Sequence, residues 1–396
     1  MVARQNVSGR KVFLVHGKRT AFGKFGGSLM DITPVDLAVH ASRALFNDLK
    51  LNPEEIDQVI LGNVVPSSTD TMYGARHLAL KLGMKISTPG HVVNRLCGSG
   101  IQIILEARNL IRLNEAEAIL CSGVENMSMV PHLTYGGRFG TKYGALPVVD
   151  MLLDALTDKY ACLPMGITAE NLAEQYKITR EECDVFSYES HAKAVKAYEQ
   201  GHLQKEITTI ELKKSKCDKD EHVRADASID AMKKLRSSFK TDGVVTPGSA
   251  SGIVDGASSV LIASEEFCNK HKLTPIAEII DGHVVGVDPK IMGIGPVPAI
   301  RGVLEKNELS LKDIDLFEIN EAFAAQALAC VKELGLDKNK LNIWGGAIAI
   351  GHPLAASGTR IAYTLARQLK EKNLKTGIAS ACIGGGQGIS LLIRRV

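Results

Sequence analysis

Short apolar runs rich in β-branched residues alternate along the chain with longer stretches in which apolar residues recur at helical spacing. The apolar runs predict strands at residues 11–17, 57–65, 91–96, 117–123, 276–286, 313–320, 341–349 and 375–383. The amphipathic stretches predict helices near residues 35–49, 72–82 and 100–113. Strands that alternate with helices in this way are typical of βαβ units. We therefore predict an α/β fold with a mostly parallel sheet.

Two parts of the chain align with each other, without a gap, at a constant offset of 258 residues (314 minus 56). The matched pairs are Ile56-Asp57 with Ile314-Asp315, Ser99-Gly100 with Ser357-Gly358, Ile103 with Ile361, and Ser122 with Ser380. A fixed offset of this kind indicates an ancient duplication. It predicts two similar α/β domains that face each other.

The segment 121–247 lies between the two aligned parts and is more charged than either. It contains one well-marked helix, because Thr179 and Glu182 form a capping-box pattern and Gly201 suits the C-terminal end. We interpret the segment as an insertion in the first domain. The chain is expected to return to that domain through residues 257–264.

Composition narrows the class of protein. A chain of 396 residues with 45% hydrophobic content suits a soluble globular protein of two or three domains. The net charge of +3 is too weak to indicate a nucleic-acid partner but is compatible with an anionic small substrate. No apolar run reaches the length of a membrane span. The eight cysteines include no CxxC pair, which disfavours a zinc site, and their scattered spacing suggests a reducing compartment.

Cys97 lies where a predicted strand ends and a predicted helix begins. Free backbone N–H groups at a helix start favour the thiolate, so a lowered pKa is expected for Cys97. Gly98 and Gly100 would let a substrate approach the backbone closely, and the same N–H groups could hold an oxyanion. The alternative is a buried structural cysteine.

His352 lies in a glycine-rich turn before another helix, and Pro353 fixes that turn. At the offset of 258 its counterpart is Asn94, three residues before Cys97. A duplicated fold would bring the two junctions together across its pseudo-twofold axis. A Cys97/His352 pair then becomes plausible, with the histidine as the base that generates the thiolate.

Two further motifs could carry chemistry. Cys382 precedes a glycine-rich turn that begins at Gly384 and would leave backbone donors free. Asn320 ends a predicted strand, where it could position a water or donate to an oxygen, although it could also cap the next helix.

Four motifs together resemble the thiolase family of acetyl-CoA acyltransferases. They are NRLCGSG (94–100), NEAFA (320–324), GGAIAIGHPLAASG (345–358) and CIGGGQG (382–388). The similarity extends over essentially the whole chain. It implies two duplicated βαβαβαββ core domains in αβαβα layers with an inserted loop domain. We place the first core domain at 1–120 plus 248–273, the loop domain for CoA binding and oligomer contacts at 121–247, and the second core domain at 274–396.

The resemblance also implies a mechanism. Cys97 would attack the keto carbonyl of a 3-ketoacyl-CoA and become acylated, while acetyl-CoA leaves as its enolate. Cys382 would protonate that carbanion, and CoA would then take the acyl group from Cys97. His352 would activate Cys97 and form one oxyanion hole with a water held by Asn320. The backbone N–H groups of Cys97 and Gly384 would form the other.

The contacts to substrate follow from the same resemblance. Ser251 matches a serine that meets the pantetheine arm, and Arg224 matches a basic residue near the adenine. Met165 and Met292 match apolar positions that line the acyl site, although ordinary core packing would also explain them. Coenzyme A and acyl-CoA are expected as substrates, with no separate cofactor or metal, and the family implies a homodimer or homotetramer.

The leading function is thiolysis of 3-ketoacyl-CoA in fatty-acid β-oxidation. The alternative is short-chain acetyl-CoA acetyltransferase activity, that is, formation or breakdown of acetoacetyl-CoA, which the catalytic residues cannot separate because the reaction is reversible. A decarboxylating ketosynthase is disfavoured because Asn320 stands where that class has a second histidine. A non-catalytic acyl-CoA-binding protein is disfavoured because it would not need both Cys97 and His352.

The first thirty residues bear on localisation. They contain no acidic residue, and the basic residues before position 20 are Arg4, Arg10, Lys11, Lys18 and Arg19. This weakly resembles a mitochondrial import segment. Pro164, where several short-chain cytosolic relatives have a histidine, favours the same interpretation. A mitochondrial enzyme is expected, with a cytoplasmic one as the alternative.

Overall fold

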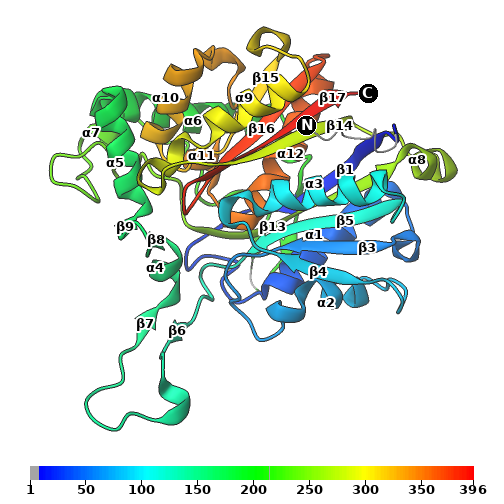
Figure 1. The fold of residues 1–396 in the computed structure, drawn as a ribbon, viewed down its shortest axis with the longest axis horizontal. Coiled ribbons are helices and arrows are strands. Elements are labelled where there is room, and N and C mark those ends of the chain that lie inside the picture. Colours follow the sequence, from blue (N-terminus) through cyan, green and yellow to red (C-terminus); the bar gives the residue numbers. More distant parts are fainter. Residues whose placement is uncertain (1–8, 214) are drawn as a thin grey trace, which may run out of the picture.

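A computed structural model of the chain describes residues 9–213 and 215–396, so Arg4 of the basic N-terminus lies outside the described residues. Within these residues the main sheet has eleven strands, and its principal path runs β4-β3-β5-β13-β1-β14-β17-β16-β15 (Figure 1). The strands on this path are β1 (Val12–Thr20), β3 (Gln58–Gly62), β4 (Gly90–Val93), β5 (Ala118–Glu125), β13 (Val254–Ser264), β14 (Ala277–Gly286), β15 (Leu316–Ile319), β16 (Thr376–Ile383) and β17 (Gln387–Arg395). The short strands β2 (Gly23–Lys24) and β10 (Ile207–Thr208) pair with β13 and β1.

The prediction of a mostly parallel sheet is wrong for the middle of this path. Strands β3, β4 and β5 pair in parallel, as do β15 and β16, in keeping with βαβ units. From β5 through β13, β1, β14 and β17 to β16 every neighbouring pair is antiparallel. One reason is that β17 follows β16 through a tight glycine turn and therefore runs antiparallel to it. The other is that the chain returns from the inserted segment along β13, which runs antiparallel to its neighbours β5 and β1.

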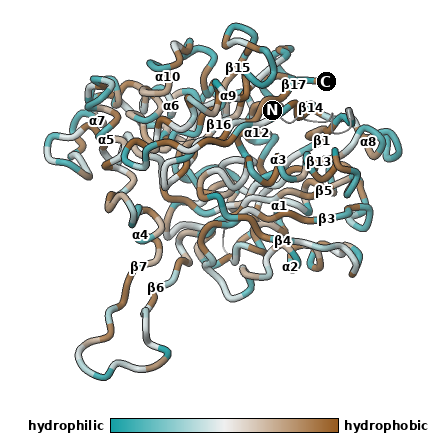
Figure 2. Tube along the Cα trace, in the orientation of Figure 1, coloured by the Kyte–Doolittle hydropathy of each residue, from teal (hydrophilic) through white to brown (hydrophobic). Residues whose placement is uncertain are grey.

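Helices cover both halves of the sheet and also fill the space between them. Helices α1 (Pro34–Leu49) and α2 (Gly74–Lys81) pack on the outer face of the first half. Helix α9 (Pro296–Lys306) packs on the outer face of the second half, and α10 (Ala324–Leu334) packs beside it. Helices α3 (Ser99–Arg112) and α12 (Leu354–Glu371) contact each other and strands of both halves. This arrangement agrees with the predicted αβαβα layers, and the apolar strands of the sheet stand out in Figure 2.

The duplication is visible in hydrogen bonds that recur at the predicted offset. Asp57 Oδ2 accepts from the backbone N–H groups of residues 117 and 118 at 2.8 and 3.0 Å. Asp315 Oδ2 accepts from those of residues 375 and 376 at 2.8 and 2.9 Å. Each aspartate therefore holds the start of the next parallel strand in its own half. The offset in the sequence thus corresponds to a repeated structural unit.

Helices α3 and α12 cross at two glycines that are also related by this offset. A Cβ atom added at Gly100 would lie 2.8 Å from Gly358 Cα, and one added at Gly358 would lie 2.8 Å from Gly100 Cα. Any larger residue at either position would force the helices apart. The crossing brings together the N-terminal ends of the two helices, where Cys97 and His352 are found.

One predicted strand, at residues 341–349, is wrong. Leu341 makes a single isolated bridge to Phe317, and Ala347–Ile350 forms the helical turn α11. A Cβ at Gly346 would overlap the carboxylate of Glu321, which also accepts from Ile348 N at 3.2 Å. The chain bends around this buried carboxylate, so its apolar residues are buried in a turn and not in a strand.

The inserted segment forms helices and a projecting hairpin. Its elements are β6 (His132–Leu133), β7 (Val149–Asp150), α4 (Met151–Ala155), β8 (Thr157–Asp158), β9 (Leu163–Pro164), α5 (Met165–Tyr176), α6 (Arg180–Glu199), β11 (Ile210–Glu211), β12 (Lys216–Cys217) and α7 (Ile229–Lys233). The capping box of Thr179 and Glu182 at α6 is confirmed. Helix α8 (Glu265–His271) follows β13. The segment between β6 and β7 extends away from the body in Figure 1. No helix within residues 9–213 and 215–396 is long and apolar enough to cross a membrane.

Candidate active site

Cys97 lies in a 3-10 turn (Leu96–Gly98) between β4 and α3 and is half-buried. Leu96 has a φ of 47°, a left-handed conformation that is unfavourable for a side chain of this size. Asn94 Oδ1 accepts from Leu96 N at 2.9 Å and holds the turn. The predicted position at a strand-to-helix junction is therefore confirmed.

His352 is buried at the start of α12, and its Nδ1 lies 2.5 Å from Ser357 Oγ. This contact is satisfied when Nδ1 carries the proton and donates to the hydroxyl, which leaves Nε2 as the acceptor. Asn320 Nδ2 lies 3.3 Å from Nε2. Asn320 is fully buried, and its Oδ1 has no hydrogen-bond partner among the described residues.

Cys382 ends β16 and is buried, and the turn after it approaches Cys97. The backbone N–H of Gly384 lies close enough to the Cys97 thiol to favour its ionised form. A Cβ at Gly98 would lie 2.5 Å from Ile383 Cδ1, so the two backbone turns are packed together. Gly385 and Gly386 have φ values of 80° and 82°, which only glycine adopts readily. The tertiary structure thus brings Cys97, His352, Asn320, Cys382 and Gly384 to one place.

The pKa values of these groups differ from the sequence-based expectation. Burial raises the pKa of Cys97 to about 11, although the N–H groups of Gly384 and of Cys97 itself oppose the shift. The expected lowering of this pKa is therefore wrong, because loss of water outweighs two N–H contacts. Burial, with a smaller effect of the charge on Arg360, lowers the pKa of His352 to about 3. Burial and the nearby Cys97 raise the pKa of Cys382. Near neutral pH the site holds two thiols and a neutral imidazole.

Cys97 and His352 open into one cavity of about 330 Å³. Met165 and Met292, which were predicted to line an acyl site, both border it, and so does Ser251. The other lining residues are mostly apolar: Met127, Leu153, Leu156, Thr157, Pro164, Gly166, Phe239, Ala250, Gly252, Ile253, Ala322, Phe323 and Leu354. A cavity of this size and lining suits an acyl chain that ends at the thiol.

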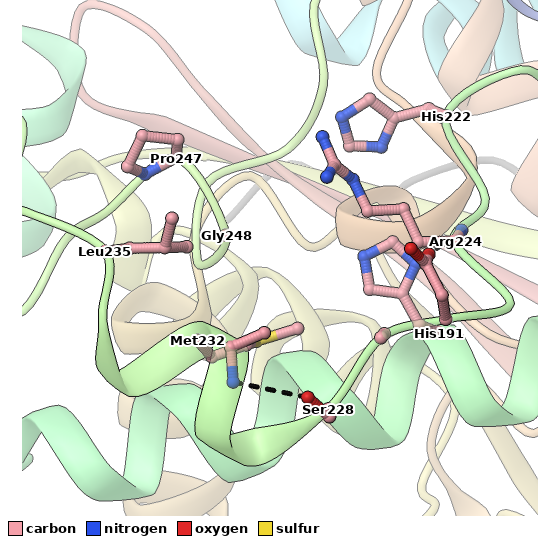
Figure 3. Close-up of a pocket in the computed structure, with 11 residues that line it drawn as sticks. His191, His222, Arg224, Ser228, Met232, Leu235, Pro247 and Gly248 are labelled. Carbon is pink, nitrogen blue, oxygen red and sulfur yellow. Dashed lines mark hydrogen bonds between the residues drawn. The ribbon is translucent and has the colours of Figure 1, made fainter.

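Arg224 borders a second cavity of about 150 Å³ (Figure 3). The imidazoles of His191 and His222 lie on the same side of this cavity as Arg224, and Pro247 and Gly248 lie across from them. Burial, and next the charge of His222, lowers the pKa of His191 to about 4. The loop 247–253 borders both cavities, with residues 247 and 248 at the cavity of Arg224 and residues 250–253 at the cavity of Cys97. Two cavities beside one loop, one with a cation and one with a thiol, suit an extended ligand with a polar end and a reactive end.

Sequence reasoning missed the role of Ser357 beside His352, although Ser357 stood in the aligned repeat. It also missed Glu125, a buried carboxylate at the end of β5. The only signal for Glu125 in the sequence was that an acidic residue follows an apolar run. Within the described part of the chain no group of three or more His, Cys, Asp or Glu side chains could hold a metal ion.

A Cys/His pair on a duplicated, five-layered α/β fold, with a second thiol beside it, defines an acyltransferase of the thiolase type. The family description "Thiolase, N-terminal domain" matches residues 12–266, and "Thiolase, C-terminal domain" matches residues 273–395. The chain belongs to the thiolase family.

Individual relatives match over nearly their full length. The chain is 48% identical to the human 3-ketoacyl-CoA thiolase, mitochondrial, over 97% of this chain and 98% of the relative. A crystal structure of human mitochondrial 3-ketoacyl-CoA thiolase in complex with CoA superposes with a TM-score of 0.96 over 98% of both chains, at 48% identity. The Bacillus anthracis acetyl-CoA acetyltransferase superposes with a TM-score of 0.94 at 42% identity, over 98% of this chain and 99% of that one.

Proposed function

We propose that this enzyme cleaves 3-ketoacyl-CoA with CoA, giving acetyl-CoA and an acyl-CoA shortened by two carbons, in fatty-acid β-oxidation. One observation carries the proposal: the Cys97 thiol, the His352 imidazole and the Gly384 N–H converge at one end of an apolar cavity. The second cavity, at Arg224, offers a cation for the phosphates and adenine of CoA.

In the first half-reaction His352 Nε2 takes the proton of the Cys97 thiol as the sulfur attacks the C3 carbonyl. The carbonyl oxygen becomes an oxyanion that the N–H groups of Cys97 and Gly384 stabilise. The C2–C3 bond then breaks, the acyl group stays on Cys97, and the Cys382 thiol protonates C2 of the leaving enolate. The unpaired Oδ1 of buried Asn320 can hold the water that, with His352, stabilises the enolate oxygen.

In the second half-reaction the Cys382 thiolate takes the proton of the CoA thiol, whose sulfur attacks the thioester on Cys97. Cys97 leaves as a thiolate and recovers its proton from His352. The neutral resting states of both groups are restored, which fits the raised pKa of Cys97 and the lowered pKa of His352.

The alternative is an acetyl-CoA acetyltransferase that makes or breaks acetoacetyl-CoA, as the name of the Bacillus anthracis relative suggests. The deciding experiment compares kcat/KM for acetoacetyl-CoA, 2-methylacetoacetyl-CoA and longer 3-ketoacyl-CoAs. We expect the longer substrates to be cleaved at least as well as acetoacetyl-CoA, because the cavity that Cys97 borders has about 330 Å³ and is also lined by Leu153 and Leu156. A preference for the four-carbon substrate would favour the alternative.

We further propose that residues 121–247 act as a loop domain for CoA binding and oligomer contacts, and that the enzyme is a homodimer or homotetramer. The hairpin between β6 and β7 exposes Phe139 and Tyr143, which are 91% and 99% exposed. Strand β4 is the edge of the sheet, and apolar Ile86 and Val92 are exposed near it. Light scattering should detect a dimer or a tetramer, and a Phe139→Ser, Tyr143→Ser variant of a tetramer should be reduced to a dimer. A monomeric wild-type chain would refute this.

Localisation in mitochondria is proposed from the basic N-terminus and from the mitochondrial human relative, with the cytoplasm as the alternative because a bacterial relative is also similar. A fusion of the first thirty residues to a fluorescent protein tests this. We also propose that the reaction needs no cofactor beyond its CoA substrates. Dialysis against EDTA should leave the rate unchanged, and a loss restored by a metal would contradict the proposal.

A further inference from the structure

The carboxylate of Glu125 is fully buried at the end of β5 and accepts hydrogen bonds through both oxygens. Oε1 accepts from Asn63 Nδ2 at 3.0 Å and from the backbone N–H of Val65 at 2.9 Å. The backbone N–H of Val64 lies 3.3 Å from Oε1 and 3.2 Å from Oε2. Oε2 also accepts from Ala355 N at 3.3 Å, across the boundary between the two halves of the fold. Burial raises the pKa of Glu125 to about 8, while these N–H donors oppose the shift by favouring the ionised form.

One arm of this arrangement leads to Cys97. Glu125 fixes the backbone at Val64, and Val64 O accepts from Asn94 Nδ2 at 3.0 Å. Asn94 Oδ1 in turn accepts from Leu96 N at 2.9 Å, immediately before Cys97. The side chain of Asn94 therefore joins the loop that Glu125 holds to the turn that carries the thiol.

The other arm leads to His352. Ala355 N, which donates to Glu125, belongs to the first turn of α12, three residues after His352. His352 O accepts from Leu354 N at 2.9 Å, and Leu354 has a φ of 20°. A leucine held in this conformation needs support from its surroundings. Leu354 and Leu96 occupy matching positions in the two halves, so both active-site turns contain a residue with positive φ.

We propose that Glu125 is a positioning residue for the thiolase reaction, holding the Cys97 turn through the backbone at Val64 and the His352 turn through Ala355 N. The proposal rests on the function proposed above. The residue at the matching position of the second half is Ile383, which packs against Gly98, so the second half offers no carboxylate there. The Glu125 carboxyl group therefore sets the separation of the two turns, on which proton transfer from Cys97 to His352 depends.

The charge of Glu125 by itself works against the reaction, which makes the two effects separable. Its negative charge adds to the raised pKa of Cys97. If Glu125 acted through its charge alone, a neutral residue in its place would ease ionisation of Cys97 and speed its alkylation. If Glu125 acts by positioning, the neutral residue should slow turnover instead.

The test compares Glu125→Gln with Asp57→Asn. The glutamine keeps the size of the side chain but points an N–H₂ group at backbone donors, so the donors facing that group lose their acceptor. Asp57 accepts from two backbone N–H groups at the opposite end of β5, far from both turns. In Glu125→Gln we expect kcat to fall by roughly 10- to 100-fold, since small misplacements of reacting groups have effects of this size, while KM for CoA changes less than about twofold. In Asp57→Asn we expect a lower unfolding temperature and an unchanged kcat.

Three outcomes in Glu125→Gln would overturn the positioning role. They are a wild-type kcat, faster alkylation of Cys97 without loss of kcat, and a rise in KM that equals the fall in kcat. If Glu125→Gln does not fold, Asn94→Ala cuts the Cys97 arm alone and should lower kcat with little change in KM. An unchanged kcat in Asn94→Ala would then refute the proposal. A wild-type enzyme that does not cleave 3-ketoacyl-CoA would instead overturn the proposed function.

Discussion

The crossing of α3 and α12 gives a sharp prediction for Gly358→Ala. The added Cβ would lie 2.4 Å from Ile101 N, 2.7 Å from Gly100 C and 2.8 Å from Gly100 Cα. All three atoms are backbone, so no side-chain rotation relieves the overlap. A normal contact needs about 3.5 Å or more, so the two helices must separate by roughly 1 Å.

Two consequences follow for stability and activity. Overpacking of a buried contact costs about 1–3 kcal/mol, and the intrinsic helical preference of alanine over glycine returns up to about 1 kcal/mol. We therefore expect the unfolding temperature to fall by a few degrees, on the order of 2–6 °C. Because the two helices carry Cys97 and His352 at their N-terminal ends, a shift of roughly 1 Å should lower kcat by about 100-fold.

The measurement combines thermal unfolding with steady-state thiolysis. Gly286→Ala is the matched control, because a Cβ there would meet no atom nearer than Gly386 O at 4.0 Å. We expect this control to keep the wild-type kcat and unfolding temperature. A Gly358→Ala enzyme that is as stable and as active as the wild type would show that the close approach of the helices is not needed.

Four further predictions concern the catalytic groups. Cys97→Ser should abolish the acyl-enzyme detected by mass spectrometry and lower kcat by about 10³-fold or more, and substantial remaining turnover would rule out Cys97 as the nucleophile. Cys382→Ser should block deuterium exchange at C2 of acetyl-CoA while Cys97 can still be acylated, so undiminished exchange would exclude the acid/base role. In His352→Ala the Cys97 thiol loses its base. Because burial raises the pKa of Cys97 to about 11, the rate at which iodoacetamide alkylates Cys97 in this variant should rise about tenfold per pH unit up to that value. A plateau in this rate near pH 7 would contradict the raised pKa. Ser357→Ala should lower kcat by roughly tenfold with little change in KM, because Nδ1 loses its acceptor and the required tautomer is no longer favoured.

Much of the fold could be predicted because its signals are local or repeated. The strands β3, β5, β15 and β16 follow from apolar runs, and the offset of 258 residues predicted a repeated unit that Asp57 and Asp315 confirm in their hydrogen bonds. The antiparallel middle of the sheet could not be predicted, because the direction of β13 depends on where a long insertion returns the chain. The strand expected at 341–349 failed because its apolar residues pack around Glu321, a partner supplied by another segment.

The sequence by itself singled out Cys97, His352, Asn320 and Cys382 as candidate site residues. Cysteine, histidine and glycine stand at the ends of predicted strands, and the repeat predicted that the junctions of Cys97 and His352 would meet. Only the tertiary structure decided how these groups behave. The pKa of Cys97 is raised because side chains from several distant segments remove water from the thiol, and a sum over such neighbours cannot be read from the residues beside it in the chain. For the same reason Ser357 and Glu125 gained their roles only when folding placed His352, Ala355 and Val64 within hydrogen-bond distance of them.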